Sequence, residues 1–230
     1  MNANRNLLKL GLALVLLSLG ASSAFADTLT FDLTAPNLGG LDCCTGPYAS
    51  VTVDRASNTT ATVTFNSLTN GGYIYLMGGA QSADLNVNAA SFTADTISGS
   101  TSLSGFLPWS VKGTPGSQNV DGFGIFNLSI DAFDGFGHSA TQVVVNLTNT
   151  SGTWASAADV LAANANGSTA AVHGFACAMP GCNGKSGAYT TGYASNGTEI
   201  EVPEPATLSL MSGLGVLAIA FRRRLARAAD

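Results

Sequence analysis

The sequence predicts an all-β fold, an antiparallel β-sandwich or jelly roll with one short helix, flanked by a signal peptide and a C-terminal membrane helix. Three observations lead to this prediction. Apolar residues alternate with polar ones through most of the 230-residue chain, which is the period of a half-buried strand. Gly, Asn, Ser and Pro bound these runs as turn residues. Basic residues accompany an apolar stretch at each end of the chain.

Alternating apolar residues predict the strands. Five runs show the pattern: Leu29, Phe31 and Leu33; Ala61, Val63 and Phe65; Leu85, Val87 and Ala89; Phe126, Leu128 and Ile130; Val143, Val145 and Leu147. Three further strands are predicted at Tyr73 to Met77, Ala170 to Phe175 and Tyr189 to Ala194. Because strands are frequent and no long helical period separates them, antiparallel pairing is favoured over parallel βαβ units.

One helix is predicted from Ala157 to Ala163. Ser156 can cap its N-terminus, and Asp159 lies in the first turn, where a negative charge is favourable. Residues 164–167 then end the helix.

The N-terminus has the features of a secretory signal peptide. Arg5 and Lys9 precede an apolar stretch over residues 10–19, and Ala24 and Ala26 form the small-x-small pattern that signal peptidase cuts after. Residues 1–26 are therefore assigned to the signal peptide, with an uncleaved anchor as the alternative.

The C-terminus has three parts between residues 202 and 230. Pro203, Glu204 and Pro205 form a stiff segment, because proline fixes its own backbone and restricts the residue before it. An apolar run over 206–221 follows, which as a helix would be about 24 Å long, somewhat short of a ~30 Å hydrocarbon core. The basic tail, 222–230, would stay cytoplasmic; its basic residues are Arg222, Arg223, Arg224 and Arg227. A permanent anchor or a buried C-terminal helix is the alternative.

At these residues the chain resembles the PEP-CTERM family of exported bacterial proteins, which end in Pro-Glu-Pro, a membrane helix and a basic tail. The resemblance implies that an exosortase, a membrane-embedded cysteine transpeptidase, recognises Pro203, Glu204 and Pro205. Signal peptidase and the exosortase would be partners during export. The helix would anchor the chain transiently in the inner membrane before it reaches the cell surface or medium.

The remaining domain, residues 27–201, is acidic. Arg55, Lys112 and Lys185 stand against twelve Asp and Glu residues, for a net charge of −9. Nucleic-acid binding is therefore improbable, because it needs clustered basic residues. Divalent cations or neutral glycans suit this surface better.

The four cysteines are expected to form disulfides, because the chain is exported. They occur as a vicinal pair, Cys43 and Cys44, and a spaced pair, Cys177 and Cys182. A crossed pairing between the two pairs is favoured over two local bridges. A zinc site using all four thiolates is the rival.

Catalytic residues are not evident. His138 and His173 stand in no known catalytic motif, and each is expected to be a packed or surface residue. Asp131 and Asp134 could be the paired acids of a glycosidase if a cleft held them at a defined separation. No enzymatic activity is the expectation, and no cofactor is required.

Two binding hypotheses accompany this expectation. Asp121, Asp131 and Asp134 lie at or near Asp-Gly turns, where oxygen ligands could hold calcium. Trp109, between Pro108 and a loop rich in Gly and Pro, could offer an exposed ring on which sugars stack.

The resemblance further implies a structural role in a surface layer or extracellular matrix, in association with exopolysaccharide. The alternative is a secreted glycan-binding or glycan-cleaving module on the same β-sandwich.

Overall fold

The fold is a single antiparallel sheet. The computed structural model describes residues 27–37, 39–133 and 135–201, with the backbone alone at 197–201. The strands are β1 (Asp27–Pro36), β2 (Ala49–Arg55), β3 (Thr60–Ser67), β4 (Thr69–Asn70), β5 (Tyr73–Met77), β6 (Ala83–Leu85), β7 (Phe92–Ser100), β8 (Gly116–Val120), β9 (Gly124–Ile130), β10 (Gln142–Asn149), β11 (Ala170–Ala178) and β12 (Thr190–Glu201). Short 3-10 turns are η1 (Leu41–Cys43), η2 (Phe136–His138) and η3 (Ala157–Asp159).

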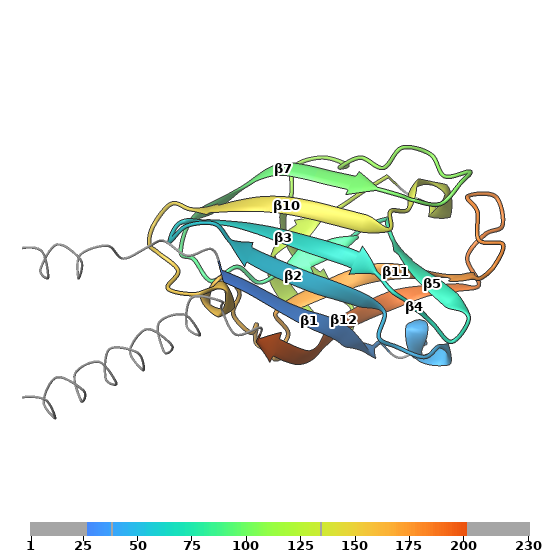
Figure 1. The fold of residues 1–230 in the computed structure, drawn as a ribbon, viewed down its shortest axis with the longest axis horizontal. Helices are drawn as coiled ribbons and strands as arrows, with labels where there is room; N and C mark the ends of the chain where they lie inside the picture. The colour runs from blue at the N-terminus through green and yellow to red at the C-terminus, as the bar shows by residue number, and fades with distance from the viewer. Residues whose placement is uncertain (1–26, 38, 134, 202–230) are drawn as a thin grey trace, which may run out of the picture.

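The strand order joins the first and last strands at the centre of the sheet. It runs β7-β10-β3-β2-β1-β12-β11-β6-β9-β8, with β5 pairing on β11 and β4 on β5. Every pair of strands is antiparallel. Figure 1 shows that β7, β10, β3, β2 and β1 form one layer and that β12, β11 and β5 continue behind it.

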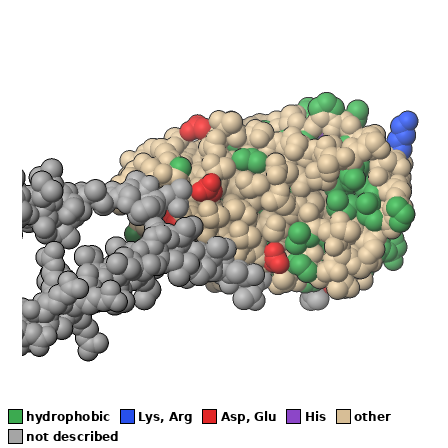
Figure 2. Space-filling model, viewed as in Figure 1, with side chains coloured by type: hydrophobic (Ala, Val, Ile, Leu, Met, Phe, Trp, Pro, Cys, Tyr) green, Lys and Arg blue, Asp and Glu red, His purple; other side chains and the backbone are tan. Residues whose placement is uncertain are grey.

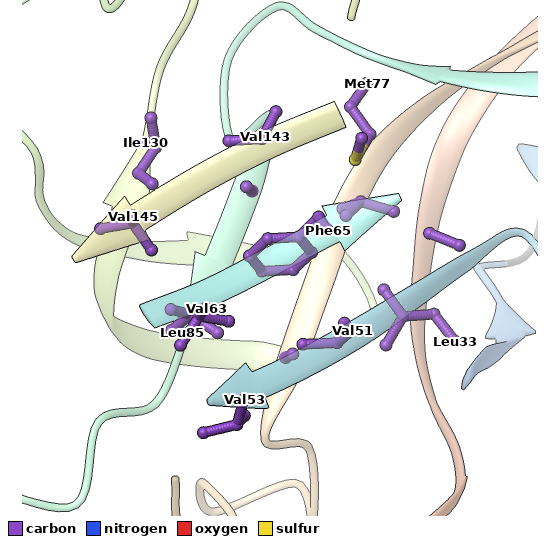
Figure 3. Packing of buried hydrophobic residues seen from close by; sticks show 14 of the residues in the cluster. Leu33, Val51, Val53, Val63, Phe65, Met77, Leu85, Ile130, Val143 and Val145 are labelled. Carbon is purple, nitrogen blue, oxygen red and sulfur yellow. The ribbon is translucent and has the colours of Figure 1, made fainter. Parts of the chain in front are cut away.

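The sheet curls around one main core. Val63 on β3 and Val145 on β10 are fully buried, and they belong to the same cluster as Leu85 on β6 and Ile130 on β9. Figure 3 shows these side chains converging from strands that are far apart in the strand order. The prediction of an antiparallel all-β fold is confirmed, and the sheet is curled. The more specific prediction of a sandwich or jelly roll stays a prediction.

The predicted alternation is seen in the burial of individual strands. On β3, Ala61, Val63 and Phe65 are buried while the threonines between them are partly exposed. A strand places successive side chains on opposite faces, so this pattern directs one face of β3 to the core. Removal of that apolar face from water is the main favourable contribution to folding.

Strand β1 is fixed at its first residue by a buried ion pair. The Arg55 Nε–H donates to Asp27 Oδ1 at 2.6 Å, and the two side chains are only 11% and 6% exposed. The second carboxylate oxygen of Asp27 accepts from the backbone N–H of Ala157 at 2.7 Å. Asp27 therefore connects β1, β2 and η3, because each oxygen binds a different element.

The predicted helix from Ala157 to Ala163 is wrong in its length. Only Ala157–Asp159 is helical, as the 3-10 turn η3. Its start was anticipated, since the Ser156 N–H and hydroxyl both donate to Asp159 Oδ2, at 2.9 and 3.0 Å. The chain then extends, and Leu161 forms a bridge with Val87. Backbone pairing with residues 86–88 satisfies the groups that a longer helix would have used internally.

The favoured crossed disulfide pairing is also wrong. Cys43 bonds to Cys44, and Cys177 bonds to Cys182. No free cysteine is present among the described residues, so the thiolates that the zinc alternative requires are not available there. Both bridges therefore act within their own loops.

Replacement of Asp27 by Asn should destabilise the mature protein by roughly 2–3 kcal/mol. The change removes the carboxylate charge that lies 2.6 Å from the largely buried Arg55 guanidinium. The free energy of unfolding from urea titration measures the effect. Asp54→Asn, on the exposed face of β2, is the control and should lie within about 0.5 kcal/mol of the unsubstituted protein. Equal stability of the two variants would contradict a structural role for the ion pair.

Candidate functional site

Most residues of the predicted targeting segments lie outside the described residues. These are Ala24, Ala26, Pro203, Glu204, Pro205, Arg222, Arg223, Arg224 and Arg227, together with the apolar run at 206–221. Within 27–37, 39–133 and 135–201, no helix is long and apolar enough to cross a membrane.

The described domain begins and ends at the same end of the sheet. Strand β1 starts at Asp27, and β12 runs antiparallel beside it, so that Leu29 is in register with Glu201. Figure 1 shows the start of β1 and the tip of β12 together, with the loop between β11 and β12 at the opposite end. In the sequence, one residue separates Glu201, the last paired residue of the sheet, from the Pro-Glu-Pro segment.

A buried carboxyl group without a partner lies on the opposite face of the sheet from the main core. Asp84 on β6 is fully buried, and neither of its side-chain oxygens has a hydrogen-bond partner. Its register partners are Ser129 on β9 and Ala171 on β11. Burial raises the pKa of Asp84 well above its usual value, with the Asp131 charge adding to the rise and the Ser129 side chain opposing it. Burial therefore favours the neutral form of this carboxyl group.

The β8–β9 hairpin contributes to the cover over this face. Val120 and Phe126 from the hairpin pack with Ala171, and Phe123 and Tyr193 pack against them. At the hairpin turn, the Asn37 side-chain amide donates to Asp121 Oδ2 at 3.1 Å. This contact ties the turn to the segment after β1.

Asp131 is held at the end of β9 by two donors. Its Oδ1 accepts from the Gln81 backbone N–H and its Oδ2 from the Gln118 side-chain amide, both at 2.8 Å. Gln81 has a φ of 56°, an uncommon value for a residue with a side chain. The Gln81 side-chain amide also donates to the Asn119 carbonyl at 2.7 Å, which links this loop to β8. The Asp131 carboxylate is consequently fixed in orientation.

His173 packs on an aromatic ring and is not paired with a carboxylate in the hydrogen bonds of the described residues. Its ring stacks on Tyr193 with centroids 4.7 Å apart, and its Nε2 lies 2.8 Å from Thr191 Oγ1. Burial lowers the pKa of His173, while the backbone at Gly78 and Ala80 opposes the shift. The imidazole is therefore neutral at pH 7. Burial also raises the pKa of the Tyr193 hydroxyl, and the nearby aspartates add to the rise.

His138 is likewise engaged in local packing. Its ring stacks on Phe133 with centroids 5.1 Å apart, and its Nδ1 lies 3.0 Å from the Pro108 carbonyl oxygen.

The three aspartates of the calcium hypothesis are not shown together. Asp121 precedes β9 and Asp131 follows it, and Asp134 lies outside the described residues. Within the part of the chain that is described, no three His, Cys, Asp or Glu side chains stand close enough to hold a metal ion. The calcium hypothesis and the Asp131–Asp134 acid pair both stay predictions.

Trp109 does not offer the exposed ring that was expected of it. Its side chain is 9% exposed, and its Nε1–H is buried without a partner. The ring lies over Gly99 on β7, where an added Cβ would come within 2.3 Å of it. The expectation of an exposed stacking platform is therefore wrong at Trp109, because the absence of a side chain at Gly99 lets the ring pack against β7. Trp154 is buried as well, and its Nε1–H donates to the Asn88 carbonyl at 2.8 Å.

Exposed apolar side chains instead come mainly from the loops at the end of the sheet opposite Asp27 and Glu201. Leu107, Phe133, Met179 and Tyr189 are the members of this set, and Tyr189 is the most exposed, at 67%. Figure 2 shows hydrophobic side chains gathering at that end of the molecule, with acidic side chains over the rest of the visible face.

Comparison with known proteins identifies the C-terminal segment. A profile of the PEP-CTERM protein-sorting motif matches residues 201–224. The chain carries a PEP-CTERM sorting motif. The motif means that it is exported and sorted by an exosortase, as the resemblance at Pro203, Glu204 and Pro205 implied. The match starts at Glu201, the last residue of β12, so it describes the sorting signal and not the folded domain. No curated protein and no solved structure matches the chain.

Sequence reasoning did not single out Asp84. It lies between Ala83 and Leu85, both of which face the core, and alternation alone would place it on a solvent-exposed face. In the folded sheet the position is nevertheless fully buried, on a strand that lies between β9 and β11. Tyr189 was predicted only as the start of a strand, and no pattern in the sequence distinguished it from buried tyrosines.

Replacement of Asp84 by Asn should change how stability depends on pH. Because the folded-state pKa of Asp84 lies above the unfolded value, its contribution to stability is complete below about pH 4 and is lost as pH rises through the folded-state pKa. The melting temperature of the unsubstituted protein should therefore fall relative to that of Asp84→Asn between pH 4 and pH 9. Thermal unfolding across this range measures the difference.

Asp95→Asn is the control, because Asp95 is an exposed aspartate on β7. Its curve should run parallel to that of the unsubstituted protein. If the Asp84→Asn curve also ran parallel, Asp84 would not be the group that titrates.

Proposed function

We propose that this protein is a non-enzymatic structural component of the cell surface or extracellular matrix that associates with exopolysaccharide. The observation that carries the proposal is the sorting motif at 201–224, which directs an exported domain to exosortase processing. The link to exopolysaccharide comes from the resemblance to the family. The charge pattern is compatible with it, because a mature domain of net charge −9 suits neutral glycans better than nucleic acids.

The arrangement of the domain supports a role as a scaffold. Asp84 is fully buried, and both oxygens of Asp131 accept hydrogen bonds from neighbouring loops and strands. Both ends of the described domain lie at one end of the sheet, which leaves the loop end to contact other molecules.

The mature protein should begin at Asp27 and end near Val202 or Pro203. A cut on the C-terminal side of Glu201 would leave the whole of β12 paired with β1, so the processed domain keeps its sheet. Intact-mass spectrometry of protein from the envelope and medium of the native host measures both ends. A bare chain, or one with an added lipid or glycan mass, is the expected species.

A chain with both Pro203→Ala and Pro205→Ala is the matched variant for this experiment. It should keep its C-terminus through Asp230, because the stiff segment that the exosortase recognises is lost. Recovery of the unsubstituted protein with Asp230 still present would contradict exosortase processing and indicate a permanent anchor.

The polysaccharide partner is tested separately. Protein from the native host should be retarded in a gel that contains the host's own exopolysaccharide, and the polymer should not be shortened. Migration equal to that in an empty gel would overturn the proposed association.

A secreted glycan-cleaving module is the second candidate, favoured by the fixed orientation of Asp131 three residues before Asp134. In that case the polymer should be shortened, and Asp134→Asn or Asp131→Asn should abolish the cleavage. Retardation without cleavage, unchanged in both variants, favours the structural role.

A further inference from the structure

The most exposed aromatic side chain of the described residues stands over a hollow at the loop end of the sheet. Tyr189 is 67% exposed and lies against Tyr73, with ring centroids 5.3 Å apart and an angle of 36° between the rings. Beside it is a hollow of about 290 Å³, lined by Ala178, Pro180, Gly181, Ser186, Gly187, Ala188 and Tyr189. We call Tyr189, Tyr73 and this hollow the Tyr189 platform.

The platform is held by covalent and backbone contacts. The Cys177–Cys182 disulfide closes the start of the loop. The Met179 N–H donates to the Gly72 carbonyl at 2.8 Å, and the Tyr189 N–H donates to the Ala176 carbonyl at 2.7 Å. These contacts anchor both ends of the loop to neighbouring strands. A ligand that binds here would thus meet a surface that is already ordered, which lowers the entropic cost of binding.

The middle of the loop is fixed by a hydrogen-bonded turn. The Asn183 N–H donates to Ser186 Oγ at 3.2 Å, and Ser186 Oγ donates to the Asn183 carbonyl at 2.8 Å. The Lys185 N–H donates to Asn183 Oδ1 at 2.9 Å. Ser186 therefore presents its hydroxyl at a defined position on the wall of the hollow.

The chemistry of the lining selects an uncharged ligand with both an apolar face and hydroxyl groups. None of the lining residues carries a charge, and Lys185 is the one charged residue between Cys177 and Tyr189. An exposed aromatic face attracts the C–H face of a ring, and the serine hydroxyl and backbone groups can bind the hydroxyls around the ring edge. A pyranose ring has both features.

We propose that the Tyr189 platform binds a pyranose unit of a polysaccharide by stacking on the Tyr189 ring. This inference rests on the proposed association with exopolysaccharide and assigns it to one surface. The platform lies at the end of the sheet opposite Asp27 and Glu201, so a polymer reaches it away from the end that leads to the sorting signal.

Two other occupants fit the platform less well. A second copy of the chain would need about 800 Å² of buried surface on each partner, whereas a hollow of about 290 Å³ accommodates one or two sugar rings. A strongly anionic polymer would be recognised through charge, and Lys185 is the one charged residue of this loop in a domain of net charge −9.

The test compares variants of the full chain, processed and recovered from the native host, by affinity electrophoresis in the host's exopolysaccharide. Tyr189→Ala should raise the apparent Kd roughly fivefold, because the stacking surface is lost. Tyr189→Phe should bind like the unsubstituted protein, since it keeps the ring. Ile125→Ala is the matched control, because Ile125 is 63% exposed and lies outside the loop end, at the start of β9. Equal melting temperatures show that each variant is folded.

Each outcome separates the platform from the broader proposal. If the unsubstituted protein and Tyr189→Ala bound the polysaccharide equally well, the platform would be overturned and the polysaccharide association would stand. No binding by the unsubstituted protein would overturn both. Lys185→Ala could also weaken binding as much as Tyr189→Ala does, with 0.5 M salt abolishing the binding. That result would overturn stacking in favour of charge recognition.

Discussion

The pairing of the first strand with the last is the constraint on which the rest of the structure depends. Strands β7, β10, β3, β2 and β1 lie on one side of this pair in the strand order, and β12, β11, β6, β9 and β8 lie on the other. On the main path of strand pairing the two sets meet where β1 pairs with β12, and an isolated bridge also links β5 to the residues before β10. Val63, Leu85 and Ile130 belong to the core that the two sets share. The Asp27–Arg55 ion pair connects the start of β1 to the end of β2.

The same pairing determines which surface the domain can present. Because the two chain ends leave from one end of the sheet, the loops that connect the strands at the other end are left for contacts with other molecules. Tyr189 and Tyr73 lie on those loops or next to them. The polar residues beneath the β8–β9 hairpin have a different role. Asp84 is fully buried, where its neutral form is favoured, and the His173 ring is stacked on Tyr193. Neither side chain is therefore presented to a ligand.

Alternation in the sequence predicted the strands that have a core-facing side. Tyr73 to Met77 coincides with β5, and the runs at Phe31, Val63 and Val145 all lie in buried strands. Strand β2 was missed although Ala49, Val51 and Val53 alternate with polar residues in the same way. Strands β7 and β8 could not be found in this way, because they lie at the two edges of the sheet and are largely exposed. Their positions are set by pairing with β10 and β9, which is a property of the tertiary fold.

Other errors also arose from contacts between residues that are distant in sequence. Trp109 is buried over Gly99, and Asp84 is buried on a strand whose partners, β9 and β11, lie far along the chain. The local start of η3 was predictable from Ser156 and Asp159, whereas its early end follows from the bridge between Leu161 and Val87. The sorting signal was the most predictable part of the chain, since Pro203, Glu204 and Pro205 are recognised as sequence and need no fold.

The two local disulfides have a consequence for the order of events during export. Cys43–Cys44 and Cys177–Cys182 join residues one and five positions apart, so each bridge can close as soon as its own segment has crossed the membrane. Neither bridge requires the distant strands to meet first. The central seam between β1 and β12 is different, because these two strands are separated by the other strands of the described domain. Oxidation of the cysteines is thus a local and early step, and closure of the sheet is a long-range and late one.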